Sequence, residues 1–207
     1  AVYDQYNDRF VVLALEQLDT GLGDPVNASR ILLAVSDDSD PNGNWYYHSI
    51  NAQVNLPDIT TPGAMLAYWT DYPGLAVDEQ AVYVTGNLFE FQSGTGTAGG
   101  NRLWIVGKGE GTGGFYDDGA ADVEMYDPAG DAGVDFTGFK SVFGLPGYRT
   151  MQPAHIFGDA PDGVGTWLAM YDGYTDFVDE YVDLVRVDNP LGTPEFTHHQ
   201  INVGDLE

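Results

Sequence analysis

The feature that most constrains this chain is a succession of short apolar runs separated by turn-forming residues. Runs rich in Val, Ile, Leu, Tyr and Trp, such as Arg9–Glu16 and Arg30–Val35, alternate with clusters of Gly, Asp, Asn and Pro. Helical periodicity is nearly absent. This pattern is typical of short β-strands joined by tight turns, so the sequence predicts an all-β fold.

The strand pattern recurs three times along the chain. The expected third strands are centred on Leu33, Trp104 and Leu184, roughly 70 to 80 residues apart, and the expected second strands keep a similar spacing. A repeat of four short strands lying side by side is the signature of a β-propeller blade. We therefore predict one β-propeller-like domain over residues 1–207, with about three four-stranded blades at residues 1–55, 70–145 and 150–205. A β-sandwich with similar hairpins is the alternative.

Three blades are too few for an ordinary propeller. Propellers close from about four to eight blades, and an open set would leave sheet edges exposed. We therefore expect the domain to be incomplete at its termini. Either the chain is part of a larger propeller, or other chains complete it by assembly.

The net charge of the chain limits the classes of molecule that it can bind. The chain has 32 acidic residues, of which 24 are Asp, and seven basic residues, so its net charge is −25. Such a charge repels nucleic acid and anionic lipid surfaces and favours cations.

Cysteine is absent, which excludes disulfides and thiol chemistry. No apolar run approaches the roughly 18 residues that span a bilayer, so we expect no transmembrane segment, and no signal peptide is visible.

Several stretches, in chain order, resemble the repeats of a known group. They are Val2–Gln5 with Arg9–Phe10, Ile31–Ser36 with Asp40–Trp45, and Asp71–Pro73 with Val77–Asp78, Tyr83–Thr85 and Asn87–Phe89. They resemble a widespread group of exported bacterial proteins with propeller-like repeats, and Gln152–His155 is similar to a later element of that group. The resemblance implies a propeller-like fold and a secreted or cell-surface location. It implies no catalytic residue.

Two acidic stretches are candidate calcium sites. Asp38, Asp40 and Asn42 match the start of a D-x-D-x-N-G calcium loop, although Ser49 stands where an EF-hand needs Glu, and a tight turn is the alternative. The second stretch gathers carboxylates that repel one another unless they are solvated or neutralised by a cation. It contains Asp117, Asp118, Asp122, Glu124, Asp127, Asp131 and Asp135. Calcium is thus the expected cofactor, and a solvated acidic loop is the alternative.

The remaining candidates are carboxylates and aromatic residues at the expected starts of blades. Asp4 and Asp71 stand at corresponding positions, where two carboxylates could face an axial funnel as in propeller glycosidases, although Asp before a strand is also ordinary turn chemistry. Tyr68, Trp69 and Tyr72 could stack on a sugar ring, with burial in the core as the alternative.

These features favour a non-catalytic extracellular or cell-surface module. It would bind a polysaccharide or a surface protein, or serve as a unit of a structural assembly stabilised by calcium. The alternative is a propeller-type glycan-active hydrolase whose catalytic carboxylates are Asp4 and Asp71. His155, in the blade-opening element, is expected to be a hydrogen-bonded structural residue.

Overall fold

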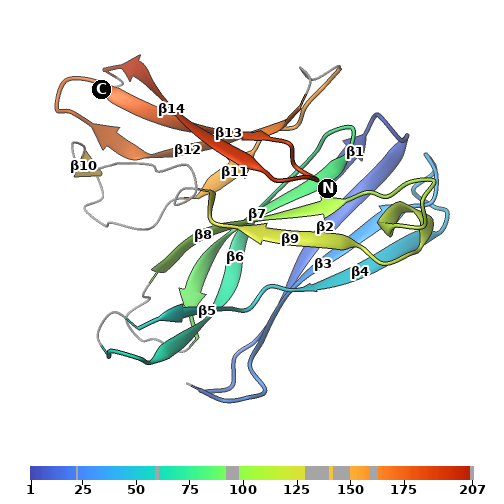
Figure 1. Ribbon diagram of the computed structural model, residues 1–207, viewed down its shortest axis with the longest axis horizontal. Coiled ribbons are helices and arrows are strands. Elements are labelled where there is room, and N and C mark those ends of the chain that lie inside the picture. Colours follow the sequence, from blue (N-terminus) through green and yellow to red (C-terminus); the bar gives the residue numbers. More distant parts are fainter. Residues whose placement is uncertain are drawn as a thin grey trace.

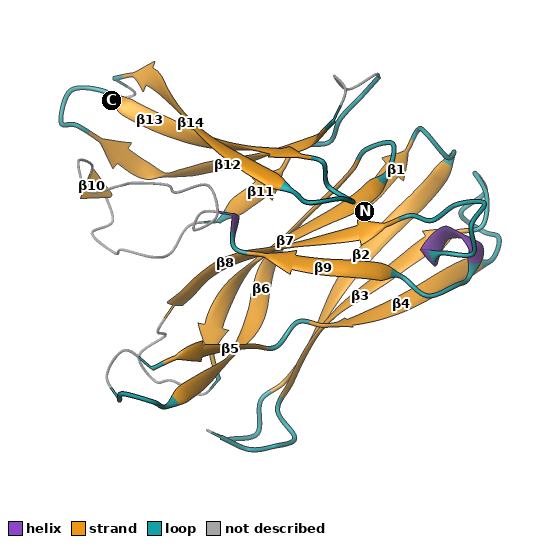
Figure 2. Cartoon of the chain, viewed as in Figure 1, coloured by secondary structure: helices purple, strands orange, loops and turns teal. Residues whose placement is uncertain are grey.

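The fold consists of antiparallel strands in three sheets. The computed structural model describes residues 1–21, 23–58, 61–91, 98–128, 140–141, 150–158 and 163–205. In this part of the chain, helical structure is limited to a single 3-10 turn, η1 (Phe115–Asp117), and to Pro128 at the end of its described range. Figure 1 labels the strands, and Figure 2 shows strands in almost every described region. The predicted all-β class is confirmed. None of the described residues forms a helix of the length and apolar character needed to cross a membrane.

Each sheet is an antiparallel meander in which strands next to each other in sequence are mostly hydrogen-bonded neighbours. Sheet A has the order β1-β2-β3-β4, sheet B the order β5-β6-β7-β8-β9, and sheet C the order β10-β12-β13-β14 with β11 also paired to β12. The strands of sheet A are β1 (Val2–Asp4), β2 (Arg9–Leu18), β3 (Ala28–Ser36) and β4 (Trp45–Asn51). Those of sheet B are β5 (Val54–Pro57), β6 (Met65–Val77), β7 (Ala81–Glu90), β8 (Ala98–Gly107) and β9 (Asp122–Tyr126). Those of sheet C are β10 (Lys140–Ser141), β11 (Met151–Pro153), β12 (Val164–Thr175), β13 (Glu180–Asp188) and β14 (Glu195–Gly204).

Sheet B lies between the other two sheets and is buried on both faces (Figure 1). Strand β7 is buried along its first eight residues. Because successive side chains of a strand point to opposite faces, Val82 and Val84 join the core shared with sheet A, whereas Ala81 and Tyr83 join the core shared with sheet C. The sequence of β7 is therefore a nearly continuous apolar run instead of an alternation of apolar and polar residues.

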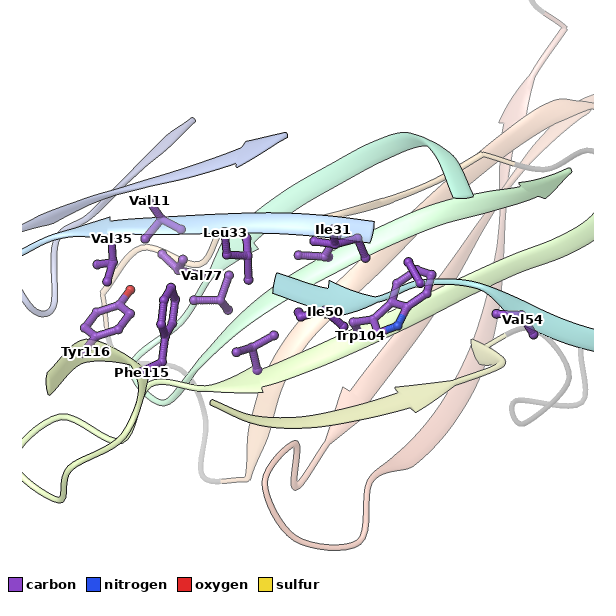
Figure 3. Packing of buried hydrophobic residues seen from close by; sticks show 14 of the residues in the cluster. Val11, Ile31, Leu33, Val35, Ile50, Val54, Val77, Trp104, Phe115 and Tyr116 are labelled. Atoms are coloured by element: carbon purple, nitrogen blue, oxygen red, sulfur yellow. The ribbon is translucent and has the colours of Figure 1, made fainter. Parts of the chain in front are cut away.

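The larger core fills the space between sheets A and B. Val11, Ile31 and Leu33 from sheet A meet Val77 and Trp104 from sheet B there (Figure 3). Phe115 and Tyr116 of η1 cover one end of this core, which explains why the loop after β8 folds back onto sheet A. The smaller core, between sheets B and C, includes Leu103, Ile105, Met151, Leu168 and Val185.

Strand β6 bends where it approaches sheet C. The pairing of β6 with β7 shifts register between Asp71 and Gly74, and Tyr72 within that bulge has a φ of 51°. Beyond the bulge, a Cβ on Gly74 would lie 2.5 Å from Pro153 Cδ and 2.7 Å from Gln152 Oε1. Glycine is required here because the Pro153 ring and the Gln152 side chain of β11 pack directly on the β6 backbone.

The structure differs from the sequence prediction in the extent of its second and third groups of strands. Sheet B begins at Val54, well before the predicted blade start at residue 70, and both sheets B and C have a fifth strand. The short strand β5 lies in a segment with no clear apolar alternation. The first half of β6 is long because it also forms a hairpin with β5.

Candidate functional site at the junction of the three sheets

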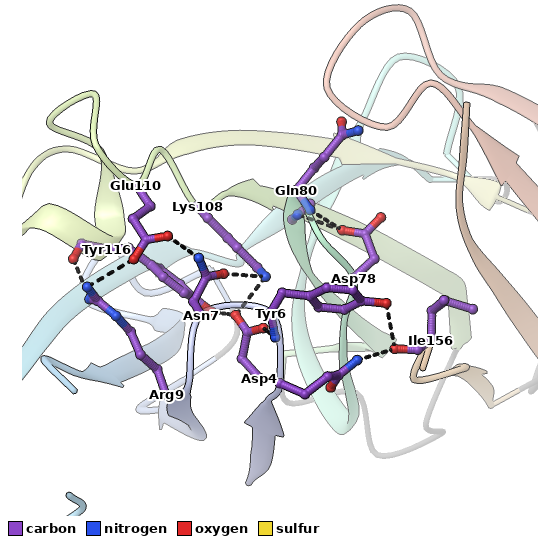
Figure 4. A network of polar contacts seen from close by, with 12 residues as sticks. Asp4, Tyr6, Asn7, Arg9, Asp78, Gln80, Lys108, Glu110, Tyr116 and Ile156 are labelled. Atoms are coloured by element: carbon purple, nitrogen blue, oxygen red, sulfur yellow. Dashed lines mark hydrogen bonds and ion pairs between the residues drawn. The ribbon is translucent and has the colours of Figure 1, made fainter. Parts of the chain in front are cut away.

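The three sheets meet in a network of polar contacts, which we call the junction (Figure 4). Sheet A contributes the end of β1 and the following turn, residues 4–9. Sheet B contributes the turn after β6 and the loop after β8, residues 78–80 and 108–116. Sheet C contributes residues 155–158, which follow β11. The junction thus joins segments that are far apart in sequence.

Asp4 and Lys108 form a buried ion pair at the centre of the junction. Asp4 is 0% exposed, and its Oδ2 lies 2.6 Å from Lys108 Nζ. The hydroxyl of Tyr116 donates to the same oxygen at 2.8 Å, and the Tyr6 N–H donates to Oδ1 at 3.0 Å. Burial raises the pKa of the Tyr116 hydroxyl, so it stays protonated and remains a donor. The carboxylate therefore has three donors.

Lys108 is held by rings as well as by charge. Its Nζ lies 5.2 Å from the ring centroid of Tyr6 and 5.5 Å from that of Tyr116, and it donates to Asn7 Oδ1 at 2.9 Å. Burial lowers the pKa of Lys108, and the neighbouring Asp4 carboxylate opposes that shift. The ammonium group is thus enclosed by two aromatic faces, one amide and one carboxylate.

A second layer of contacts fastens the β1–β2 turn to the loop after β8. Arg9 donates to the Tyr116 carbonyl at 2.6 Å and lies 3.2 Å from Glu110. Asn7 donates to the same Glu110 carboxylate. Sheets A and B are therefore tied by polar contacts at this end in addition to their shared apolar core.

Asp78 is a second buried carboxylate near the junction. It accepts hydrogen bonds from the N–H groups of Gln80 and Ala81, at 2.8 and 2.7 Å, and from the Tyr83 hydroxyl at 2.7 Å. Burial raises the pKa of Asp78, while these hydrogen bonds oppose the rise. Its bonds close the tight turn between β6 and β7, which identifies it as a turn-stabilising residue.

Sheet C joins the junction through the segment after β11. Gln5 donates to the Ile156 carbonyl at 2.7 Å, and the Tyr6 hydroxyl donates to the Gly158 carbonyl at 2.6 Å. His155 Nε2 lies 2.9 Å from Gln5 Oε1. Because the Gln5 oxygen can only accept, the imidazole is the donor, in agreement with the structural role expected for His155. Burial lowers the pKa of His155, which favours this neutral form.

A cup of about 350 Å³ opens beside these contacts, between β1 and the segment after β11. Its lining is Val2, Tyr3, Gln5, His155 and Phe157. The rings of His155 and Phe157 lie 4.5 Å apart, and Phe157 is 77% exposed. The cup is wide open to solvent, and its exposed lining is almost wholly apolar. Apolar concave surfaces are typical of ligand binding. We call this site the junction cup.

The three aromatic residues predicted to face a ligand do not lie together on one surface. Tyr68 is buried in the core between sheets A and B. Trp69, on the opposite face of β6, packs 5.4 Å from the ring of Phe89, and Tyr72, which is largely exposed, lies 6.2 Å from the same ring. The alternation of side chains along β6 separates Tyr68 from Trp69.

The two carboxylates considered for catalysis have different surroundings. Asp4 is enclosed by the donors described above. Asp71 lies at the β6 bulge, where its Oδ1 accepts the Tyr72 N–H at 2.8 Å. The junction brings Asp4 together with Lys108 and Tyr116, and the contacts of Asp71 are local. A general acid or nucleophile must reach its substrate, and Asp4 has no exposed surface.

The first candidate calcium loop is closed by hydrogen bonds within the loop. Asp38 Oδ1 accepts the Asp40 N–H at 2.7 Å, and Asp40 Oδ1 accepts both the backbone N–H and the side-chain amide of Asn42 at 2.9 Å. These bonds lower the pKa of the Asp40 carboxyl. An Asp carboxylate that accepts the backbone N–H two residues further on is ordinary turn chemistry. The turn therefore forms through its own hydrogen bonds.

The second candidate stretch is spread over several elements. Asp117 lies in η1 and accepts the Gly113 N–H at 2.8 Å, Asp118 follows with a φ of 61°, and Asp122 begins β9 opposite Gly107. Asp131 and Asp135 lie outside the described residues. Among the residues that the structure describes, no group of three or more His, Asp or Glu side chains is placed to hold a metal ion. Calcium binding remains a prediction.

The sequence reasoning missed Lys108, Tyr116 and Phe157. One signal for Lys108 was available, because it is one of two lysines in a strongly acidic chain and lies in a glycine-rich segment. A lysine in such an acidic chain has many potential partners, and only the fold selects Asp4.

Comparison of the chain with protein-family models, with curated proteins and with solved structures gives no match.

Proposed function

We propose that this chain is a non-catalytic module that binds a polysaccharide or a surface protein in the junction cup. Its sheets form a β-propeller-like arrangement of blades, and it acts outside the cell or at the cell surface. The observation that carries the proposal is the position of the cup. It opens where β1 of sheet A meets the segment that follows β11 of sheet C, beside a network of polar contacts.

The packing of the sheets supports the blade arrangement. Three antiparallel meanders are stacked face to face, and the central one is buried on both sides. The first strand of sheet A, the bent part of β6 and strand β11 approach one another, as the innermost strands of blades do around an axis. The resemblance to exported bacterial proteins with propeller-like repeats would fit this arrangement and remains a prediction.

The lining of the cup supports binding. Tyr3, His155 and Phe157 offer ring faces, on which a sugar ring or an apolar side chain can pack. Gln5 and His155 are fixed by their mutual hydrogen bond and by the Ile156 carbonyl, so the walls are preorganised. A preorganised site loses less conformational entropy when a ligand binds.

The surroundings of Asp4 weigh against the glycan-active hydrolase. Its carboxylate is enclosed by Lys108, Tyr116 and the Tyr6 backbone, so it is neither a free nucleophile nor a proton donor. Its contacts instead hold sheets A and B together. We therefore favour binding without cleavage.

A panel of polysaccharides scored for both retention of the protein and new reducing ends tests this proposal. Retention without cleavage, lost in Phe157→Ala, is the expected result. The matched control is Phe177→Ala, because Phe177 is 74% exposed and lies in the β12–β13 turn instead of the cup. We expect the Phe157 variant to bind at least about tenfold more weakly, which corresponds to the loss of one stacked ring.

Other outcomes would contradict the proposal in different ways. New reducing ends that disappear in Asp71→Asn would establish an enzyme. Retention that is equal in the Phe157 and Phe177 variants would place the binding surface outside the cup. If no polysaccharide is retained, immobilised surface proteins are the second panel, with the same two variants.

A further inference from the structure

Both end sheets of the stack expose an apolar face. On sheet A, the face turned away from sheet B carries Tyr3, Val12, Ala14, Leu32, Ala34 and Tyr47. On sheet C, the face turned away from sheet B carries Trp167, Ala169, Val182, Leu184, Ile201 and Val203. We call these the outer face of sheet A and the outer face of sheet C.

The exposure of these faces is substantial. Tyr47 is 75% exposed, Val12 37% and Ile201 45%. The residues lie in register, with Val12 opposite Ala34 and Ala34 opposite Tyr47, so they form continuous rows across the strands. Contiguous apolar patches of this kind mark interaction surfaces on soluble proteins.

The charged residues of the outer faces lie away from their central rows. The net charge is −25, yet the row of Val12, Ala34 and Tyr47 holds no carboxylate. Neither does the row of Ala169, Leu184 and His199. Glu16, at the end of the sheet A face, is paired with Arg30. At the end of the sheet C face, Asp188 is paired with Arg186, and the exposed Glu195 lies opposite Asp188. Depletion of charge at the centre of a surface is a property of interface cores.

We infer that the outer face of sheet C in one copy of this chain packs on the outer face of sheet A in a second copy. Within the chain, sheet A presents one face to sheet B, and sheet B presents its opposite face to sheet C. If the stacking order A, B, C is continued, sheet A of a second copy lies on the outer face of sheet C. One contact between copies would therefore continue the existing stack, and it would use both exposed faces.

A second copy fits both outer faces at once, because a repeated head-to-tail contact covers both kinds of face with a single geometry. This inference rests on the proposed blade arrangement. Tyr3 belongs both to the outer face of sheet A and to the lining of the junction cup, so the substitutions below lie on β2 and β13, away from the cup.

The test is the mass of the 207-residue chain in solution, measured by sedimentation velocity over a wide range of concentrations. We expect a mass that rises above the 22.4 kDa of one copy, and association that strengthens with salt. Salt screens the repulsion between acidic copies but spares an apolar contact. A chain that stays a monomer at every concentration and salt level would overturn the inference.

Two substitutions separate the faces. Val12→Glu changes the outer face of sheet A, and Leu184→Glu changes that of sheet C. Both residues lie on inner strands of their sheets, so the variants do not alter a sheet edge. Each variant alone should associate at least about tenfold more weakly, because the added carboxylate must be desolvated. Val26→Glu is the control, since Val26 is an exposed loop residue and the added charge is the same.

Mixing the two variants gives the decisive result. The Val12 variant keeps an intact sheet C face, and the Leu184 variant keeps an intact sheet A face, so their mixture should form heterodimers. A contact between two identical faces would instead leave one variant fully associated by itself, and this would overturn the inference. Tyr47→Glu and Ile201→Glu, at more exposed positions, replace any variant whose circular dichroism shows loss of folding. Binding in the junction cup, lost or kept in these variants, reports separately on the proposed function.

Discussion

At the scale of single residues, the junction depends on a buried ion pair that is completed by hydrogen bonds. Removing two charges from water costs several kcal/mol, and their attraction offsets this cost only when the remaining donors and acceptors are satisfied. Asp4 and Lys108 meet this condition through Tyr116, Tyr6 and Asn7. The pair therefore fixes how sheets A and B meet, and its incomplete forms should be strongly destabilised.

We expect Lys108→Met to lower the free energy of unfolding by about 3–5 kcal/mol, because it leaves the buried Asp4 carboxylate without its cation. Urea denaturation measures the loss. Arg30→Met is the matched control, since the Arg30–Glu16 pair is about half exposed and such pairs contribute less than about 1 kcal/mol. The double variant Asp4→Asn with Lys108→Met should recover part of the loss. Equal effects at Lys108 and Arg30 would show that the junction pair is not buried in solution.

Asp78 predicts a specific dependence of stability on pH. Burial raises its pKa in the folded state, so the unfolded chain releases its proton at a lower pH than the folded one does. The contribution of this group is therefore largest below the ordinary aspartate pKa, and it is lost as pH rises through the raised value. Asp78→Asn removes this loss.

The measurement is the difference in unfolding free energy between Asp78→Asn and the unchanged chain, from pH 3.5 to about pH 7. We expect the difference to shift in favour of the variant as pH rises, and then to level off. Any constant offset caused by the amide has no bearing on this change. A difference that is flat across the range would mean that the carboxylate is not desolvated.

At the scale of elements, β6 and β7 organise the whole molecule. Strand β7 supplies apolar side chains to two cores at once, and β6 bends at its bulge so that its second half reaches sheet C. The approach of β6 to β11 is possible only because residue 74 has no side chain. The docking of sheet C thus depends on the packing of β11 side chains against residue 74 as well as on its apolar core.

Gly74→Ala should lower the free energy of unfolding by at least about 1–3 kcal/mol, because the new methyl group would overlap Pro153 and the Thr85 hydroxyl. Gly21→Ala is the control, since a Cβ at Gly21 meets no atom within 4 Å. We expect the control to change stability by no more than about 0.5 kcal/mol. Thermal and urea unfolding check both variants, and a silent Gly74 variant would mean that β11 does not pack on β6 as described.

At the scale of the whole molecule, a net charge of −25 opposes compaction. Repulsion among exposed carboxylates destabilises the folded state and is screened by salt. The cores between the sheets and the buried junction are much less sensitive to ionic strength. Solution conditions should therefore change the stability of this protein without changing its fold.

We expect the melting temperature to rise as sodium chloride increases from about 20 mM to about 500 mM. Calcium at matched ionic strength separates screening from a specific site. A further rise that a chelator reverses would support calcium binding, for which Asp38, Asp40, Asn42, Asp117, Asp118 and Asp122 are the candidates. Identical melting in the two salts would leave screening as the whole effect and would contradict the calcium prediction.

The sequence by itself determined the class of structure and most of its strands. Apolar runs between turn residues predicted β2 and β3 close to their observed bounds, and the expected strands centred on Trp104 and Leu184 are β8 and β13. Local periodicity succeeds here because it reflects the two faces of a strand. The threefold recurrence predicted three groups of antiparallel strands. Less of the candidate site could be predicted from the sequence: Asp4 and His155 were identified, but the residues that contact them were not.

Only the tertiary structure decided which face of each strand is buried and which polar groups meet. Alternation places Tyr68 and Trp69 on opposite faces, but the position of sheet A makes Tyr68 the core residue. Lys108 is separated from Asp4 by about half of the chain, and nothing local to either residue specifies the pair. Contacts between distant segments depend on how whole sheets stack, and that stacking is a property of the packed cores rather than of any single stretch of sequence.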